Sequence, residues 1–105
     1  MRVRLDYFDQ NESFAALLPR EGTIERFLSS ADGGKWALFR LDAPAEYEGK
    51  SYDYFLLRSR WAGYEIGGPA PASVFILLVD DGSKLGAGFN VKEFEHMAWG
   101  MVGNK

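Results

Sequence analysis

The single histidine, His96, is the first residue to test for chemistry, because the chain has no cysteine to act as a nucleophile or soft metal ligand. Glu93 and His96 have the spacing of the Glu-x-x-His element of carboxylate metal sites, which need a second such element and further glutamates. With one histidine, the chain has one such element. We therefore expect no metal ion and no cofactor, and interpret His96 as a solvent-side or capping residue.

Nucleophilic and phosphate-binding motifs are incomplete. Ser83 follows a glycine but lacks the second glycine of a Gly-x-Ser-x-Gly turn, and residues 81–84 have the composition of a hairpin turn. Residues 86–88 begin a Gly-x-Gly pattern, yet Val91 stands where a third glycine belongs. We predict neither a Ser-His-acid set nor a nucleotide site, and no catalytic residue is assigned.

Acidic pairs occur at Asp80 with Asp81 and at Glu46 with Glu48. General acid–base catalysis needs one carboxyl to be desolvated enough to raise its pKa, whereas acids in turns are usually solvated. These pairs therefore indicate solvated turns. On this basis we expect a protein without enzymatic activity.

Aromatic residues are unusually dense between residues 47 and 64. This window of eighteen residues holds six of the sixteen aromatic residues: Tyr47, Tyr52, Tyr54, Phe55, Trp61 and Tyr64. Strand alternation over 51–61 would send Tyr52, Tyr54, Arg58 and Arg60 to the face opposite Phe55, Leu57 and Trp61. Tyrosine and arginine carry much of the binding energy at protein interfaces.

These residues predict a binding module that contacts a macromolecular partner, most simply a protein, through Tyr52, Tyr54, Arg58, Arg60 and Tyr64. Two structural alternatives remain open. The tyrosines and arginines could only stack across strands by cation–π contacts, or a C-terminal helix could cover the face.

Nucleic acid is not expected as the partner. The formal net charge is −3, with ten acids and seven bases in residues 1–53 and five of each in residues 54–105. A protein that neutralises several phosphates normally shows a basic surface. Arg58 and Arg60 alone do not provide one.

The rival hypothesis is a small-molecule pocket in a β-barrel. Such a pocket would be lined by aromatic residues, and Arg58 or Arg60 would hold an anionic group. A minor enzymatic role would then use Glu65 or His96 for proton transfer. The candidate pocket residues are Trp36, Trp61, Tyr64, Glu65, His96 and Trp99.

The elements that position these residues are mostly strands. Residues 2–8 alternate with period two and predict a half-buried strand, and residues 12–18 have helical spacing that Pro19 ends. Residues 23–42 predict a hairpin around the turn at Asp32, although a helix ending at the glycine pair is the alternative. Residues 74–79 are continuously apolar and predict a strand covered on both faces.

The C-terminal part predicts a helix near 91–101, because Asn90 and Glu93 form a capping pair and apolar residues follow at helical spacing. The whole pattern indicates a mainly β (α+β) single domain over 1–105. We expect a strongly curved antiparallel sheet or barrel of five to six strands, with a helical turn near 12–18 and this terminal helix.

Composition bounds the remaining properties. Without cysteine, a secretory signal or an apolar run near the roughly 20 residues of a transmembrane helix, the chain is expected to be cytoplasmic and not bound to a membrane. Its acidic character and small size would suit a bacterial accessory or inhibitory protein. The segments 2–8 and 52–60 could be edge strands that pair with a second copy.

Overall fold

The computed structural model describes residues 1–7, 18–61, 65–79, 85–94 and 97–104. Their regular structure consists of strands and one short 3-10 helix. In chain order these are β1 (Arg2–Tyr7), β2 (Arg20–Ser29), β3 (Lys35–Tyr47), β4 (Lys50–Ser59), β5 (Ala72–Val79), η2 (Val91–Glu93) and β6 (Met97–Asn104).

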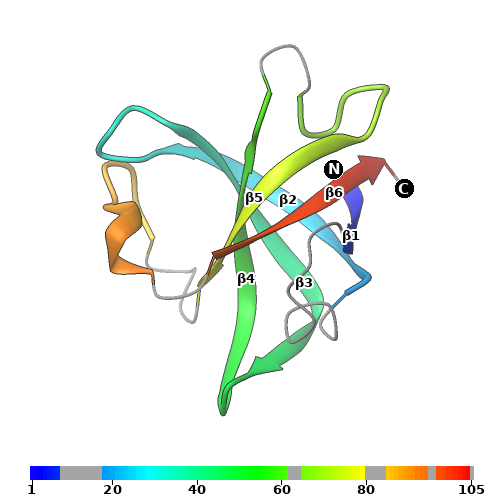
Figure 1. Cartoon of the computed structure of the whole chain (residues 1–105), viewed down its shortest axis with the longest axis horizontal. Helices are drawn as coiled ribbons and strands as arrows, with labels where there is room; N and C mark the ends of the chain where they lie inside the picture. The colour runs from blue at the N-terminus through cyan, green and yellow to red at the C-terminus, as the bar shows by residue number, and fades with distance from the viewer. Residues whose placement is uncertain (8–17, 62–64, 80–84, 95–96, 105) are drawn as a thin grey trace.

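The strands form a closed antiparallel barrel (Figure 1). Each strand pairs with the next along the chain, and β6 returns to pair with β1, for example Leu5 opposite Val102. The structure thus confirms the mainly β class and the barrel. It also overturns the idea of an exposed edge, because β1 and β4 both have a partner strand on each side.

Strand alternation fills the barrel. In β1, Val3 and Leu5 are fully buried while Arg2 and Arg4 are exposed, as the period-two pattern predicts. The same alternation in the other strands brings large apolar side chains together in the centre. The interior cluster is Val3, Leu5, Ile24, Ala37, Phe39, Leu41, Ala45, Tyr52, Phe55, Leu57, Ala72, Val74, Ile76, Leu78, Ala98 and Val102.

The predicted hairpin and the predicted apolar strand are both confirmed. β2 and β3 pair as a hairpin around residues 30–34, which excludes the helical alternative for this segment. In β5, Ile76 and Leu78 belong to the interior cluster, whereas Leu77 and Val79 face a second cluster on the outside of the barrel. The strand is therefore covered on both faces.

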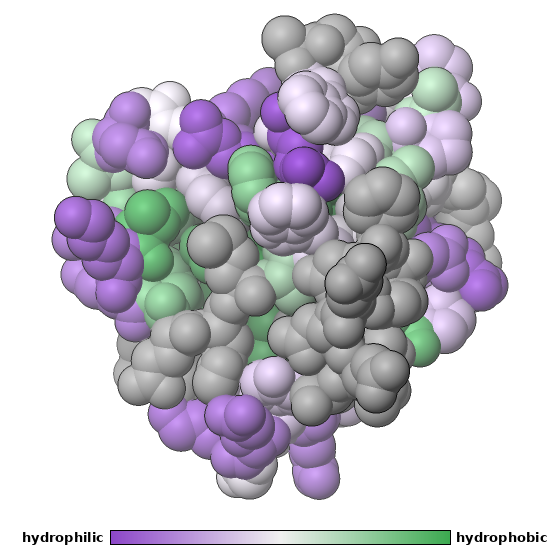
Figure 2. Space-filling model, viewed as in Figure 1, coloured by the Kyte–Doolittle hydropathy of each residue, from purple (hydrophilic) through white to green (hydrophobic). Residues whose placement is uncertain are grey.

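A short connecting segment, residues 85–94, covers that second cluster. Leu85, Phe89, Val91 and Phe94 pack against outward-facing residues of β2–β5. The segment is held by a parallel bridge between Ser30 and Phe89 and by backbone hydrogen bonds, including one of 2.7 Å from the Ala31 N–H to the Phe89 oxygen. Figure 2 shows hydrophobic residues at the surface on the side of the molecule where η2 lies.

The predicted helix over 91–101 is wrong. Asn90 does cap a helix, accepting from the Lys92 N–H, but only the 3-10 turn Val91–Glu93 forms. Met97–Asn104 is instead a strand in which Ala98, Gly100 and Val102 are buried at alternate positions. Gly100 permits close packing, because a Cβ there would lie 2.7 Å from the Asp6 oxygen and 2.9 Å from Ile76 Cδ1.

The predicted helical turn near 12–18 lies outside the described residues, except for Leu18. Across the described ranges, no helix is long and apolar enough to cross a membrane.

Candidate interaction surface

Arg60 lies directly after β4 and is fastened to the beginning of β5. Its backbone N–H donates to the Ser73 oxygen at 2.9 Å, and its guanidinium Nη1 lies 3.5 Å from the Ser73 hydroxyl. This anchoring directs the side chain over the outer faces of β5 and β6.

Three aromatic rings surround the Arg60 guanidinium. Its central carbon lies 3.8 Å from the ring centroid of Trp99, 5.3 Å from that of Trp61 and 5.7 Å from that of Phe75. Phe75 and Trp99 are register partners, and their rings meet edge to face at 5.7 Å and 82°. All three distances fall within the range of cation–π attraction.

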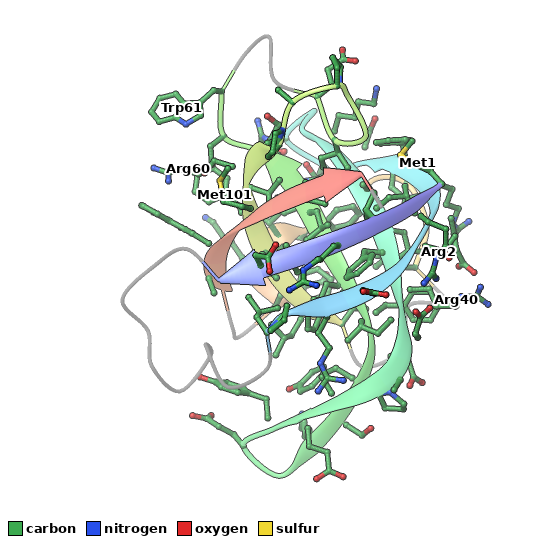
Figure 3. The ribbon with its side chains drawn as sticks, turned by 90° about the vertical axis from the view of Figure 1, so that its right-hand side faces the viewer. Met1, Arg2, Arg40, Arg60, Trp61 and Met101 are labelled. Atoms are coloured by element: carbon green, nitrogen blue, oxygen red, sulfur yellow. The ribbon has the colours of Figure 1, made fainter. Side chains whose placement is uncertain are left out.

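These side chains remain accessible. Trp61 is 58% exposed and Trp99 37% exposed, and Arg60, Phe75 and Met101 are half-buried. Figure 3 shows Arg60, Trp61 and Met101 gathered on one side of the barrel. We call this set, with Ser73, the Arg60 surface: Arg60, Trp61, Ser73, Phe75, Trp99 and Met101.

The charge of Arg60 is not balanced by an acid. Within the described part of the chain, no carboxylate forms an ion pair with it. β5 and β6, which support the surface, contain no charged residue at all. Arg60 is thus a cation held by ring faces and by one hydroxyl.

Arg58, two residues earlier, has a different environment. Its Nη1 lies 3.9 Å from Asp32, and its guanidinium lies over the ring of Trp36 at 5.9 Å. The absence of a side chain at Gly34 allows this approach, since a Cβ there would lie 2.5 Å from Arg58 Nη1. Arg58 therefore fastens β4 to the β2–β3 turn rather than joining the Arg60 surface.

Hydrogen bonds within the β2–β3 turn hold the Asp32 carboxylate in place for this contact. It accepts hydrogen bonds from the Ser30 hydroxyl and from the Gly34 N–H. These bonds, the first of them most strongly, lower the pKa of the Asp32 carboxyl, with a smaller contribution from Arg58. The carboxylate form is thereby favoured.

The two strand tyrosines of the predicted face do not lie together. Tyr54 shares the outer face of the barrel with Arg58, as predicted, but the prediction for Tyr52 is wrong. Tyr52 is 4% exposed and belongs to the barrel interior, opposite Ala45. Tyr54 packs on the outer cluster, and burial, with help from Glu25, raises the pKa of its hydroxyl. The alternation changes because the β3–β4 register shifts between Arg40 and Ala45. Tyr64 lies outside the described residues.

The residues of the predicted pocket are also dispersed. Trp36 is buried in the outer cluster against Phe89, and its indole N–H has no hydrogen-bond partner in the described part of the chain. Glu65 is exposed, and His96 lies outside the described residues. Trp61 and Trp99 do come together, but on the outside of the barrel, next to Arg60.

Across the residues that the structure describes, the interior cluster consists of other side chains, including the fully buried Phe39, Phe55 and Leu5, and contains none of these candidate pocket residues. Among the described residues, no group of three or more histidines, aspartates or glutamates is close enough to hold a metal ion.

Sequence reasoning missed Phe75 and Met101, and it placed Trp99 with Arg60 only in the rival hypothesis of a pocket in the barrel. The signal was present in the alternation of 97–104, which sends Trp99 and Met101 outwards when Ala98, Gly100 and Val102 face the interior.

Comparison with known proteins adds no assignment to this geometry. No protein-family model matches the chain, and neither a curated protein nor a solved structure shows significant similarity to it.

Proposed function

We propose that this protein is a non-enzymatic interaction module that binds another protein through the Arg60 surface. The observation that carries the proposal is a half-buried arginine that lacks an acidic partner in the described residues and lies between two exposed tryptophans. Tryptophan and arginine are the residue types most enriched among those that dominate binding energy.

The arrangement also favours binding for a geometric reason. Strands β5 and β6 hold Phe75 and Trp99 on a closed barrel, so the rings are positioned before a partner arrives. A preorganised surface loses less conformational entropy on association than a mobile one. The rim of the surface is polar at Ser73, as interfaces commonly are at their edges.

The test compares the proteins captured from a cell lysate by the immobilised wild type with those captured by an immobilised Trp61→Ala/Arg60→Gln variant. Phe27→Ala is the matched control, because Phe27 is 42% exposed and also contacts a cation, Lys35, but on a different strand. We expect specific proteins captured by the wild type and by the control to be lost from the double variant, as measured by quantitative mass spectrometry. All variants should remain folded, with at most a modest decrease in Tm.

The same captured set from all three proteins would refute the proposal. Binding that is lost only with Phe27→Ala would refute it as well, since the interface would then lie elsewhere.

A further inference from the structure

We infer that the Arg60 surface binds an acidic peptide segment of a partner protein, in which a carboxylate is flanked by aromatic or other large apolar side chains. This inference rests on the proposed function and adds the chemistry of the bound segment. It is argued from the charge of Arg60, from the geometry of its stacking and from the apolar character of its surroundings.

The first step concerns charge. Arg2, Arg4, Arg40 and Arg58 each lie within 4.0 Å of a carboxylate oxygen. Arg60 has no such neighbour among the described residues, and its surroundings are ring faces and Ser73. A cation with an apolar environment and no counter-charge is complementary to an incoming anion.

The second step concerns geometry. The guanidinium is planar, and its N–H donors point outwards in that plane. The guanidinium carbon of Arg60 lies 3.8 Å from the Trp99 ring centroid, which is the separation expected for a planar group stacked by its face on a ring. Apart from the 3.5 Å contact with Ser73, the described residues take up none of its side-chain donors. A carboxylate can accept two of these bonds side by side.

The third step concerns the flanking residues of the ligand. Trp61, Trp99 and Met101 offer apolar area on either side of the guanidinium. Side chains next to the bound carboxylate would cover these rings and exclude water from the ion pair. This strengthens the attraction, because exclusion of water lowers the local dielectric constant.

A nucleic acid fits less well. The affinity of a protein for nucleic acid depends on the neutralisation of several phosphates along the nucleic-acid strand. Strands β5 and β6 contain no basic residue, and Arg60, which follows β4, is a cation next to them. One guanidinium between apolar rings matches one carboxylate between apolar side chains.

The experiment uses the full chain and a defined probe, the blocked pentapeptide Gly-Phe-Glu-Phe-Gly, titrated to millimolar concentration. The readout is the indole N–H signals in proton–nitrogen NMR spectra. Trp61 and Trp99 should shift and saturate. Trp36, which is 4% exposed and packed against Phe89, should stay in place as an internal reference.

Two changes should each weaken binding at least tenfold: replacement of the peptide glutamate by glutamine, and Arg60→Gln in the protein. Arg60→Lys should give an intermediate affinity, since it keeps the charge but loses the planar stack. Arg40→Gln is the matched control and should bind as the wild type does, because Arg40 lies on the opposite side of the barrel (Figure 3).

Equal affinity for the glutamate and glutamine peptides, an unaltered affinity in Arg60→Gln, or no shift at millimolar peptide would overturn the inference. Tighter, Arg60-dependent binding of an oligothymidylate of eight nucleotides would overturn it in favour of nucleic acid. If the tryptophan-dependent capture of partners persists while the peptide fails, only this inference fails. If that capture is absent, the proposed function itself fails.

Discussion

Arginines on opposite sides of the barrel are held in different ways. On one side, Arg2 forms two hydrogen bonds of 2.6 Å with Asp42, and Arg40 lies 3.4 Å from Glu25. On the other side, Arg60 is stacked on aromatic rings and meets no acid in the described residues. Whether an arginine on the outer face pairs with an acid therefore depends on the residues that its neighbouring strands carry.

The strand compositions explain this difference. β1, β2 and β3 each contain both acids and bases, so cross-strand neighbours of opposite charge can pair on their outer faces. β5 and β6 contain neither, and the residues that they place near Arg60 are Ser73, Phe75 and Trp99. Arg60 therefore lies next to strands without acids, and among the described residues it forms no ion pair. Arg26 forms none either, but its guanidinium donates to the Leu85 backbone oxygen at 2.6 Å.

The largest effect on stability is expected from a substitution in the barrel interior, which lies between the two sides. Phe39 is fully buried between β2 and β4 and packs against Phe55 with ring centroids 6.2 Å apart. Phe39→Ala should lower the free energy of unfolding by about 3–5 kcal/mol. Urea denaturation followed by tryptophan fluorescence and by far-ultraviolet circular dichroism should give one shared transition.

Separate transitions from the two probes would show instead that the sides of the barrel unfold independently. Leu56→Ala, in the outer cluster, is the control for loss of a buried side chain outside the interior.

The barrel was predictable from sequence because its signals are local. Alternation at Val3 and Leu5, the turn at Asp32 and the apolar run of β5 each specify a strand without reference to the rest of the chain. The last element was not predictable in this way. Its apolar residues fit both the period of a helix and the period of a strand. Pairing with β1 and β5 stabilises the strand, and this pairing is a tertiary effect.

The candidate site was predicted only in part, for the same reason. Arg60 was predicted for the partner-binding face and Trp61 for the rival pocket. Their grouping with Trp99 depends on the strand order, which a single sequence does not specify. Tyr52 was misplaced because the alternation of β4 breaks between Tyr52 and Phe55, which both face the interior. The break lies next to the register shift between β3 and β4. Local pattern identifies the residue types, and the closed barrel decides which of them meet.

The substitution Ser73→Asp should give Arg60 an acidic partner. It places a carboxylate where the Ser73 hydroxyl lies 3.5 Å from the Arg60 guanidinium. Because the new acid competes for the same donors, binding of the acidic peptide should weaken about tenfold, which corresponds to about 1.4 kcal/mol. The NMR titration measures this loss, and the unfolding free energy should change by less than about 1 kcal/mol.

Ser73→Asn is the control of equal size without charge and should bind the peptide almost as the wild type does. Equal losses in the Asp and Asn variants would mean that shape at Ser73, and not the charge of Arg60, sets the affinity.

A smaller effect should distinguish the two sides by their response to salt. Arg40→Gln breaks an exposed ion pair and should cost about 0.2–1 kcal/mol of stability at low salt, a difference that shrinks in 1 M salt. Arg60→Gln should cost about 0.5–1 kcal/mol, and this difference should persist, because the guanidinium and the Trp99 ring are in contact. Urea denaturation at two salt concentrations measures both, and identical salt responses would contradict the distinction.

The smallest effect on stability is expected at the contact between Arg58 and Asp32. Arg58 is both paired with an acid, Asp32, and placed over a ring, Trp36. The pKa of the Asp32 carboxyl is lowered from 3.8, chiefly by the Ser30 hydroxyl. The folded state therefore binds fewer protons here than the unfolded state does, and the resulting stabilisation is present above pH 3.8 and lost as the pH falls through the lowered pKa.

Asp32→Asn should accordingly be slightly less stable than the wild type at neutral pH, and the difference should disappear in acid below the lowered pKa. Urea denaturation across this pH range measures it. The effect is small because the carboxylate is exposed, so solvent screens its interactions. If the difference instead persisted unchanged in acid, it would come from the hydrogen bonds that the amide alters and not from the carboxylate charge, and the Trp36 ring would be the main contact of Arg58.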